Sequence, residues 1–360
     1  MIGDSAQSDG GPKVFLQTFG CQMNELDSEL VESHLRALGY QFVTEPHQAE
    51  VVLYNTCSVR EQAENKASSR IGIIGKEKLE GRQVVLGVLG CMAEREGSAM
   101  IKRLPQIDFL CGPAELDKVP MLIDNALKGA VVEEADRMML QGNRARRSAT
   151  LQAATDSLEV LDLSRAFDPS RAEAGGRTAY VRITRGCNKF CTYCVVPHTR
   201  GAEIHRPPEA IVDECKRLAD AGVIEVTLLG QTVNHYHYVH GVALTVSGGE
   251  APQVGPGASA FTKGHQQSAT ERVTSFADLL SRIHEEVPAI KRLRFVTSYP
   301  RDFGDDALAV MAQSPRICRY LHVPAQSGSN DVLKRMNRGY TVEQYEHFVQ
   351  RAREFMPDVS

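Results

Sequence analysis

The chain has 360 residues and a formal net charge of −4, with 42% hydrophobic and 24% charged residues. This composition is ordinary for a soluble globular protein, and the length predicts two domains. No apolar run approaches the roughly 18 residues of a membrane span, and the polar, Gly-rich start shows no secretory signal. The net charge gives no general attraction to nucleic acid, so any RNA contact must come from local patches.

The number of cysteines indicates what the thiols do and in which compartment the protein works. The chain has nine cysteines, an odd number. In a long chain without a secretory signal, this favours metal-binding or catalytic thiols in a reducing compartment over a disulfide framework. We therefore expect a cytoplasmic protein.

The first part of the chain alternates predicted strands and helices. Asn24 is a suitable N-cap for the first helix, whose leucines recur at helical spacing up to Leu38, and Gly39 is expected to end it. Strands are predicted at 13–20, 49–56, 83–90 and 107–110, and further helices after Arg60 and over 118–127. This alternation predicts an α/β domain over 13–130 with a parallel, doubly wound sheet.

A cysteine follows each of the first three long strands, at Cys21, Cys57 and Cys91, about one βα unit apart. The carboxyl ends of parallel strands line one edge of an open sheet, where ligands bind. These residues are therefore predicted to meet as a three-thiolate iron–sulfur site with one iron unclaimed. Strand-end cysteines are also common as small buried hydrophobes, and that alternative stays open. Cys111, in Cys-Gly-Pro, is interpreted as structural.

Residues 131–177 are polar and predicted to be a linker, and 178–360 again alternate strands and helices. The predicted elements are strands at 178–185, 225–230, 292–297 and 320–324, and helices at 208–221, 276–286 and 342–355. This pattern predicts a partial (β/α) barrel with its site at the strand ends. Residues 235–272, rich in Gly, Ser, Pro and Ala, are predicted to be an insertion. Its histidines, which are His235, His237, His240 and His265, fit a solvated loop better than a metal site. Cys215 and Cys318 are expected to be packing residues.

The loop after the first strand of this part reads Cys187-x3-Cys191-x2-Cys194, with Tyr193 before the last cysteine. Three thiolates from one loop can each hold one iron of a 4Fe–4S cluster, which leaves the fourth iron open for a ligand. A zinc site is the alternative, but it needs a second Cys or His pair. Only His198, His205 and Cys215 follow within about 25 residues. His198 follows Pro197, and His205 lies among Arg200, Glu203 and Arg206, a context that favours ligand binding or a solvated loop.

These residues also match a known family. The C-x3-C-x2-C loop resembles that of radical S-adenosylmethionine enzymes. The residues around all six cysteines resemble one branch of these enzymes, the methylthiotransferases. Within that group the chain resembles the tRNA isopentenyladenosine methylthiotransferases of the MiaB type. The resemblance covers residue 13 to the end, apart from 235–272. It rests on 20–24 (GCQMN), 55–61 (NTCSVRE), 90–91 (GC), 196–201 (VPHTRG), 230–234 (GQTVN) and 321–329 (LHVPAQSGS).

The resemblance implies two 4Fe–4S clusters and S-adenosylmethionine, two molecules per turnover. The cluster on Cys187, Cys191 and Cys194 would bind S-adenosylmethionine and yield a 5′-deoxyadenosyl radical, which takes hydrogen from carbon 2 of an isopentenylated adenosine beside the tRNA anticodon. The cluster on the three strand-end cysteines would deliver the sulfur, and a second S-adenosylmethionine the methyl group. In such enzymes the cofactors carry the radical chemistry and the protein positions them.

The same resemblance suggests contacts and partners. Tyr193 is expected near the adenosyl group, and Gln231, Ser298 and Gln326 are candidate S-adenosylmethionine contacts. Basic residues near the loop could meet phosphates or the cosubstrate carboxylate, or form a solvated basic face: Arg185, Lys189, Arg200 and Arg206. The expected partners are tRNA bearing isopentenyladenosine and a reductase or flavodoxin-type electron donor. We expect a monomer without membrane association.

The family's barrel has six strands and is followed by a small RNA-binding β-barrel, whereas about four strands precede Ser360. We therefore expect a radical S-adenosylmethionine barrel that is incomplete, truncated at its C-terminal side. The alternatives are a methylthiotransferase acting on threonylcarbamoyl-adenosine in tRNA or on a ribosomal protein, an inactive iron–sulfur-binding fragment, and a zinc-binding module.

Overall fold

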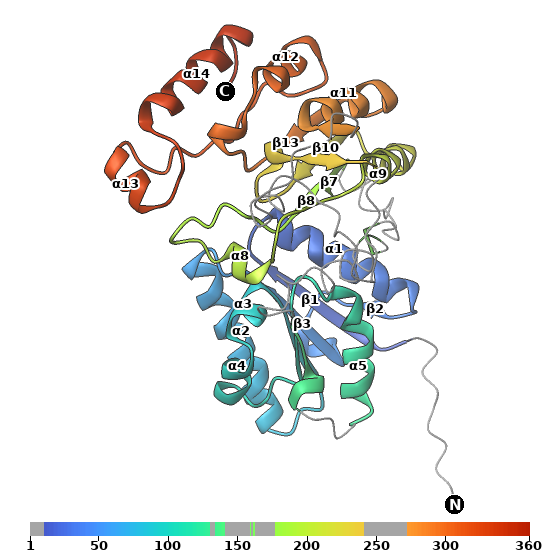
Figure 1. Ribbon diagram of the computed structural model, residues 1–360. Helices are drawn as coiled ribbons and strands as arrows, with labels where there is room; N and C mark the ends of the chain where they lie inside the picture. The colour runs from blue at the N-terminus through green and yellow to red at the C-terminus, as the bar shows by residue number, and fades with distance from the viewer. Residues whose placement is uncertain (1–10, 130–133, 141–158, 160, 163–176, 241–271) are drawn as a thin grey trace, which may run out of the picture. The chain divides into compact units, whose positions relative to one another are not determined.

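The computed structural model describes residues 11–129, 134–140, 159, 161–162, 177–240 and 272–360. The chain divides into two compact units, each with its own parallel sheet (Figure 1). Unit 1 contains the described residues up to 140 together with 159, 161 and 162, and unit 2 those from 177 onward. Among these residues, no helix is long and apolar enough to cross a membrane.

Unit 1 is a six-stranded parallel sheet with helices on both faces. In spatial order its strands are β2 (Gln41–Phe42), β1 (Lys13–Phe19), β3 (Val51–Thr56), β4 (Val85–Gly90), β5 (Phe109–Cys111) and β6 (Met138–Met139). Its helices are α1 (Gln22–Ala37), α2 (Glu61–Leu79), α3 (Cys91–Glu96), α4 (Ser98–Arg103) and α5 (Val119–Leu127), with 3-10 turns at Pro46–Gln48, Leu116–Lys118 and Glu134–Arg137. In Figure 1, α2 and α4 cover one face and α1 and α5 the other.

The predicted parallel sheet is confirmed, and burial explains it. Every residue of β3 and β4 is buried, as expected for central strands covered on both faces. Helix α2 presents Ala67, Ile71 and Ile74 at helical spacing to the sheet residues Val52 and Tyr54. The core of unit 1 therefore fixes where each strand ends.

Two details of the first predicted helix are wrong. The helix begins at Gln22 with Cys21 as its N-cap, so Asn24 lies inside the first turn. Asn24 is fully buried and its amide bonds to β3 rather than to the helix end. Leu38 is 55% exposed rather than part of the apolar face. Gly39, at a φ of +90°, follows the helix end as predicted.

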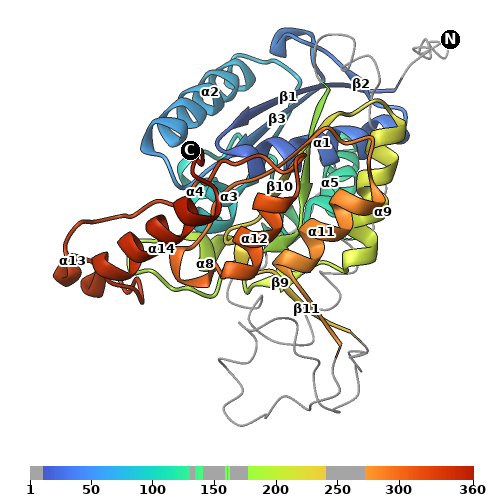
Figure 2. The same cartoon turned by 90° about the horizontal axis from the view of Figure 1, so that it is seen from above.

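Unit 2 contains a three-stranded parallel sheet in the order β13 (Arg292–Phe295), β10 (Glu225–Leu229) and β7 (Thr178–Arg182). Its longer helices are α9 (Pro208–Asp220), α11 (Phe276–Glu286), α12 (Asp305–Gln313) and α14 (Val342–Phe355), which follow one another side by side in Figure 2. The core lies between this row and the sheet. Shorter elements are α8 (Val196–Thr199), α13 (Asn330–Arg335) and the 3-10 turns Val233–His235 and Pro300–Asp302. This arrangement is the α/β fold that the repeated βα units predict.

Two further pairings in unit 2 were not predicted. The strand expected over 178–185 breaks at Ile183, and its end, β8 (Thr184–Arg185), pairs antiparallel with β9 (Ile204–His205). A second antiparallel pair joins β11 (His237–Val239), near the start of the predicted insertion, to β12 (Val273–Ser275), directly after its end. The part between them, with His265, lies outside the described residues, as does most of the predicted linker 131–177.

The strand predicted at 320–324 is wrong, because this segment is irregular. Its backbone makes single bonds to different neighbours instead of a regular ladder. The Leu321 N–H donates to the carbonyl of Ser360 (2.8 Å), and the His322 carbonyl accepts from the Ser298 N–H (3.1 Å). The bridge to β13 forms earlier in the chain, between Ile317 and Leu293. Cys215, on α9, is fully buried in the core of unit 2, as expected.

Candidate metal centres

The strand register of unit 1 brings its three candidate cysteines to one edge of the sheet. Phe19 pairs with Thr56, and Thr56 pairs with Gly90, so β1, β3 and β4 end in line. Cys57 and Cys91 directly follow this line and are 1% and 4% exposed. Cys21 lies two residues beyond Phe19 and is partly buried. Residues far apart in sequence therefore share one site, which we call the strand-end cysteines.

Glycines before two of these cysteines permit the close approach. A Cβ atom on Gly20 would lie only 2.7 Å from the Cβ of Cys57. Gly90 has a φ of +90°, and a Cβ there would lie 2.4 Å from the Asn55 amide oxygen. Only glycine fits such positions without displacing the neighbouring backbone or side chain. The Gly-Cys pairs of the sequence are thus explained by packing at the sheet edge.

A buried amide network supports the strand-end cysteines, and the sequence analysis missed it. The Cys21 thiol donates to the Asn24 side-chain oxygen (3.4 Å), and the Asn24 amide donates to the Thr56 carbonyl and to Asn55 (both 3.1 Å). The Asn55 amide in turn donates to the Asn24 carbonyl and to Ser28 (both 2.9 Å). Both asparagines are fully buried. Their only sequence signal is their place beside the cysteines.

The surroundings of Cys57 favour the neutral form of its thiol. A hydrogen bond with Cys21, burial and the neighbouring Cys91 raise the pKa of the Cys57 thiol. The Val59 N–H, which donates to the Cys57 sulfur (3.3 Å), works in the opposite direction. Metal binding would therefore release a proton from Cys57.

The fourth cysteine of unit 1, Cys111, has a partner within the protein. Cys111 is fully buried in β5, and its thiol donates to the Glu115 carbonyl (3.1 Å).

In unit 2 the three candidate cysteines come from one loop, which we call the cysteine loop (187–194). Gly186 enters it at a φ of +65°, and a Cβ there would lie 2.0 Å from the Ala202 carbonyl oxygen. The Cys187 N–H donates to the Gly201 carbonyl (3.2 Å), and the Cys194 N–H to the Cys191 carbonyl (2.9 Å). Burial raises the pKa of Cys187 to about 12 and also raises the pKa of Cys194.

The cysteine loop is anchored by a distant segment, 335–338, which begins at the last residue of α13. The Thr192 N–H donates to the Met336 carbonyl (3.1 Å), and the Asn337 amide to the Phe190 carbonyl (3.0 Å). The guanidinium of Arg338, a buried residue, donates to the Cys191 sulfur (3.2 Å). Burial acts to lower the pKa of Arg338, but bonds to Tyr340 and Cys191 outweigh it and raise that pKa. Arg338 is therefore a cation fixed beside the sulfur of a candidate cluster ligand.

Two of the four predicted S-adenosylmethionine contacts lie together at this loop. The Tyr193 hydroxyl donates to the Gln326 side chain (2.9 Å), and Tyr193 is 53% exposed. Gln231 and Ser298 lie instead just past the carboxyl ends of β10 and β13, where the Val233 N–H donates to the Thr297 carbonyl (3.1 Å). Ser298 is 4% exposed, and its hydroxyl has no partner among the described residues.

Backbone strain gathers in the same unit. The non-glycine residues with positive φ in the described chain are Phe190, Thr297, Gln326 and Asn337. A β-branched residue such as Thr297, at +71°, is an outlier in this region. Such strain is retained where the surrounding structure holds it, typically at functional sites. Its location supports a site that includes the cysteine loop and the ends of β10 and β13.

The basic residues near the loop do not form a solvated face. Arg206 is fully buried and pairs with Glu214 of α9 (2.8 Å) while donating to the Arg182 carbonyl (2.6 Å), so it is a core ion pair rather than a phosphate contact. Arg185 is also buried, at 6% exposure. Lys189 pairs with Asp302 and lies 4.9 Å from the Tyr299 ring centre. The proposed anion contacts are therefore wrong for Arg206.

The donor sets bear on the zinc alternative. The cysteines of each group are near enough to shift one another's pKa, so each group offers three thiols at one place. A structural zinc site needs four protein ligands. Three thiolates instead match a four-iron cluster, in which each thiolate binds a different iron.

Comparison with known proteins gives the family. Residues 13–112 match the model of Uncharacterized protein family UPF0004, and residues 181–360 match that of the Radical SAM superfamily. The tRNA-2-methylthio-N(6)-dimethylallyladenosine synthase of Opitutus terrae is 37% identical over 96% of this chain and 68% of its own length. The chain belongs to the Radical SAM superfamily and, within it, to the family of this synthase. The resemblance drawn from the motifs is therefore confirmed.

A further relative and two solved structures show how far the match reaches. The relative of the same name from Rhodopirellula baltica is 39% identical over 96% of this chain. The chain spans 64% of the length of that relative. The radical S-adenosylmethionine methyltransferase TsrM from Kitasatospora setae is similar with a TM-score of 0.58, at 15% identity over 96% of this chain and 66% of its own. The cobalamin-dependent radical enzyme OxsB gives 0.53, at 12% identity over 95% and 47%. These two similarities concern the fold alone.

Proposed function

We propose that this radical SAM protein is a tRNA methylthiotransferase that converts N6-isopentenyladenosine next to the anticodon into its 2-methylthio derivative. The observation that carries the proposal is the presence of two separate groups of three cysteines in a chain of this family, one at the carboxyl ends of the unit 1 sheet and one in the loop that follows β8. Curated relatives named for this product support the substrate. We place the enzyme in the cytoplasm, as a monomer served by a flavodoxin-type electron donor.

The donor sets fit two 4Fe–4S clusters, one on Cys187, Cys191 and Cys194 and one on the strand-end cysteines. When bound with S-adenosylmethionine, such clusters supply one-electron radical chemistry and a sulfur atom for insertion. The chain's own residues position and protect these groups. Burial of Cys187 and Cys57 keeps water from the sulfur atoms, and the 335–338 anchor holds the cysteine loop in one conformation.

The remaining site residues would orient S-adenosylmethionine. Tyr193 and Gln326 present a hydrogen-bonded pair beside Cys194, with a half-exposed ring available for stacking on an adenine. Ser298 offers a buried hydroxyl with no partner among the described residues, which a polar ligand group would satisfy. Gln231 follows β10 at the same strand-end level and offers an amide. Each role is a positioning role.

An anaerobic turnover tests the proposal. Reconstituted protein would receive reductant, S-adenosylmethionine and a tRNA whose isopentenyladenosine carries deuterium at carbon 2. We expect a 2-methylthio nucleoside and deuterium in the recovered 5′-deoxyadenosine, and neither product with a tRNA that lacks the isopentenyl group. Loaded clusters with no modified nucleoside would overturn the proposal for this chain and favour an inactive iron–sulfur-binding protein. Product formed instead on threonylcarbamoyl-adenosine tRNA or a ribosomal protein would move the chain to another methylthiotransferase branch.

A further inference from the structure

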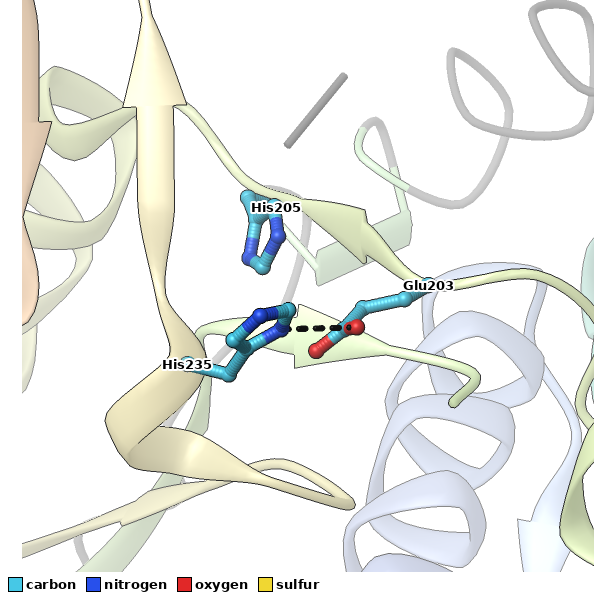
Figure 3. A group of neighbouring side chains, drawn as sticks. All are labelled: Glu203, His205 and His235. Atoms are coloured by element: carbon cyan, nitrogen blue, oxygen red, sulfur yellow. Dashed lines mark hydrogen bonds and ion pairs between the residues drawn. The ribbon is translucent and has the colours of Figure 1, made fainter. Parts of the chain in front are cut away.

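Unit 2 contains a third group of metal-ligating side chains, which the proposed function does not use. Glu203, His205 and His235 place one ligand atom each within 4.8 Å of one another, the only such group among the described residues. Figure 3 shows the two imidazole rings and the carboxylate facing one another. Glu203 and His205 come from the β9 segment and His235 from the turn after β10. We call this group the Glu-His-His cluster.

One member of the group, His205, is buried without a hydrogen-bond partner among the described residues. His205 is 2% exposed, and neither of its ring nitrogens has a hydrogen-bond partner in the part of the chain that the structure describes. A neutral imidazole has one donor and one acceptor, and leaving both unpaired in the interior is costly. His205 also packs edge-on against Tyr236, with ring centres 5.6 Å apart. This contact gives the two ring nitrogens no hydrogen-bond partner. A ligand at this point would remove the cost.

The other two side chains are already oriented as ligands with outer support. His235 Nδ1 lies 2.9 Å from a Glu203 oxygen, and the Thr232 hydroxyl donates to the other Glu203 oxygen (3.0 Å). The Glu203 N–H donates to the Asn188 side chain (3.2 Å). Hydrogen bonds of this kind fix ligand carboxylates in metal sites. Burial acts to raise the pKa of Glu203, but the bond to His235 and nearby cations lower it, so the carboxylate stays charged.

We propose that Glu203, His205 and His235 bind one divalent transition-metal ion of the zinc type, as a third metal centre ligated by nitrogen and oxygen. Two histidines and a carboxylate are a donor set that zinc accepts, with at least one position left for water or a small ligand. Ligand bonds of about 2.0–2.2 Å need only a small inward movement of the present side chains. Burial lowers the pKa of His205 to about 4, which supports the neutral ring that a metal requires.

An ion at the Glu-His-His cluster would change the charge next to the cysteine loop. Glu203 lies beside the cysteine loop, because its N–H donates to the side chain of Asn188, the residue directly after Cys187. A bound dication would offset the Glu203 charge beside the loop. It would also tie the β9 segment to the turn after β10. The ion is therefore expected to stabilise unit 2 and to leave the iron content of the cysteine sites unchanged.

The test uses the reconstituted protein with its iron–sulfur clusters loaded, so that cysteines do not capture the probe. Zinc is added anaerobically in slight excess, the protein is desalted, and zinc and iron per chain are measured. We expect about one zinc per chain and a zinc absorption spectrum with nitrogen and oxygen at about 2.0–2.1 Å and no sulfur at about 2.3 Å. Zinc bound with sulfur neighbours, or no retained zinc, would overturn the proposal, and a buried water would then satisfy His205.

Variants make the assignment specific. Glu203→Gln keeps the side-chain shape, and His235→Ala changes a partly exposed residue, so both are expected to fold; circular dichroism checks this. Each should weaken zinc retention by at least about tenfold, since even the loss of outer-shell partners costs 10–100-fold. His347→Ala, an exposed histidine on α14, is the matched control and should retain the zinc. Equal retention in all three variants would rule the site out. Neither result depends on whether the tRNA is modified.

Discussion

The two cysteine sites of this molecule are built in opposite ways. In unit 1 three cysteines far apart in sequence meet because the register Phe19–Thr56–Gly90 ends three strands in line. In unit 2 one loop supplies all three cysteines, but its shape depends on hydrogen bonds to a segment more than 140 residues away in sequence. The first site is thus held by the sheet itself. The second is held by a remote anchor, and the variants below are chosen to test that difference.

The largest expected effects come from the cysteines themselves. Cys187→Ala should abolish 5′-deoxyadenosine formation, whereas Cys57→Ala should leave that product and abolish only the methylthio nucleoside. The reason is that the two cysteine groups belong to different compact units with separate cores. Both products and the iron per chain would be measured, and each variant should lose about half of the iron, one 4Fe–4S cluster of two. If Cys57→Ala also removed the iron of the cysteine loop, the two sites would not be independent.

Glycine-to-alanine substitutions test the packing that each site requires. Gly90→Ala and Gly186→Ala should each lower the free energy of unfolding by about 1–3 kcal/mol, because a side chain would be forced into a positive-φ position against a neighbouring oxygen. Gly186→Ala should also reduce iron in the cysteine loop. Denaturant unfolding of the apoprotein measures both. Gly72→Ala is the matched control: this exposed glycine lies inside α2 with open space around it, and the change should stabilise by up to about 1 kcal/mol. Destabilisation in all three would point to a general effect of alanine.

The charge beside each site provides a finer comparison. Arg338→Met should lower the reduction potential of the cluster on the cysteine loop, on the order of 50 mV, because a one-electron change of about 1.4 kcal/mol corresponds to 59 mV. The removed guanidinium donates to the Cys191 sulfur and stabilises added negative charge there. A redox titration followed by electron paramagnetic resonance measures the shift.

Two controls accompany this variant. Arg335→Met changes an exposed arginine in the same anchor and should leave the potential unchanged. Asn55→Ala removes a neutral support of the strand-end cysteines. It should cost stability, about 1–3 kcal/mol, without moving the potential of the cysteine loop. A potential that fell equally in Arg338→Met and Arg335→Met would show that general surface charge, not the bond to Cys191, sets it.

The same contrast explains how much the sequence could predict. Strand order and the convergence of Cys21, Cys57 and Cys91 follow from local alternation, because parallel strands that alternate with helices end at one edge. The roles of Asn24 and Arg338 could not be predicted in this way. Their partners are set by packing across the unit, and Asn24 even matches a helix N-cap locally. The strand predicted at 320–324 was wrong for a similar reason: the apolar run is real, but its backbone partners are single bonds to separate segments.

The meeting of two histidines, His205 and His235, could not be predicted from the sequence either. Sequence reasoning weighed His205 and His235 separately, one in a basic context and one in a presumed insertion loop. Their meeting depends on β8 pairing with β9 and on the turn that directly follows β10. No local spacing encodes that pairing, so the Glu-His-His cluster is visible only in the fold.

The smallest expected effect concerns the exposed side of the cysteine loop. Tyr193→Phe removes only the hydroxyl that donates to Gln326 and keeps the ring. A half-exposed neutral hydrogen bond contributes about 0.5–1.5 kcal/mol, so the KM for S-adenosylmethionine should rise roughly two- to tenfold. The kcat for 5′-deoxyadenosine formation should change little, since the cysteine ligands and the 335–338 anchor stay in place. Gln326→Ala should give the same rise, and the double variant no more than either single one, because both lose one shared bond. Additive effects would instead mean that Tyr193 and Gln326 meet S-adenosylmethionine independently, and that the observed pair is broken when the cosubstrate binds.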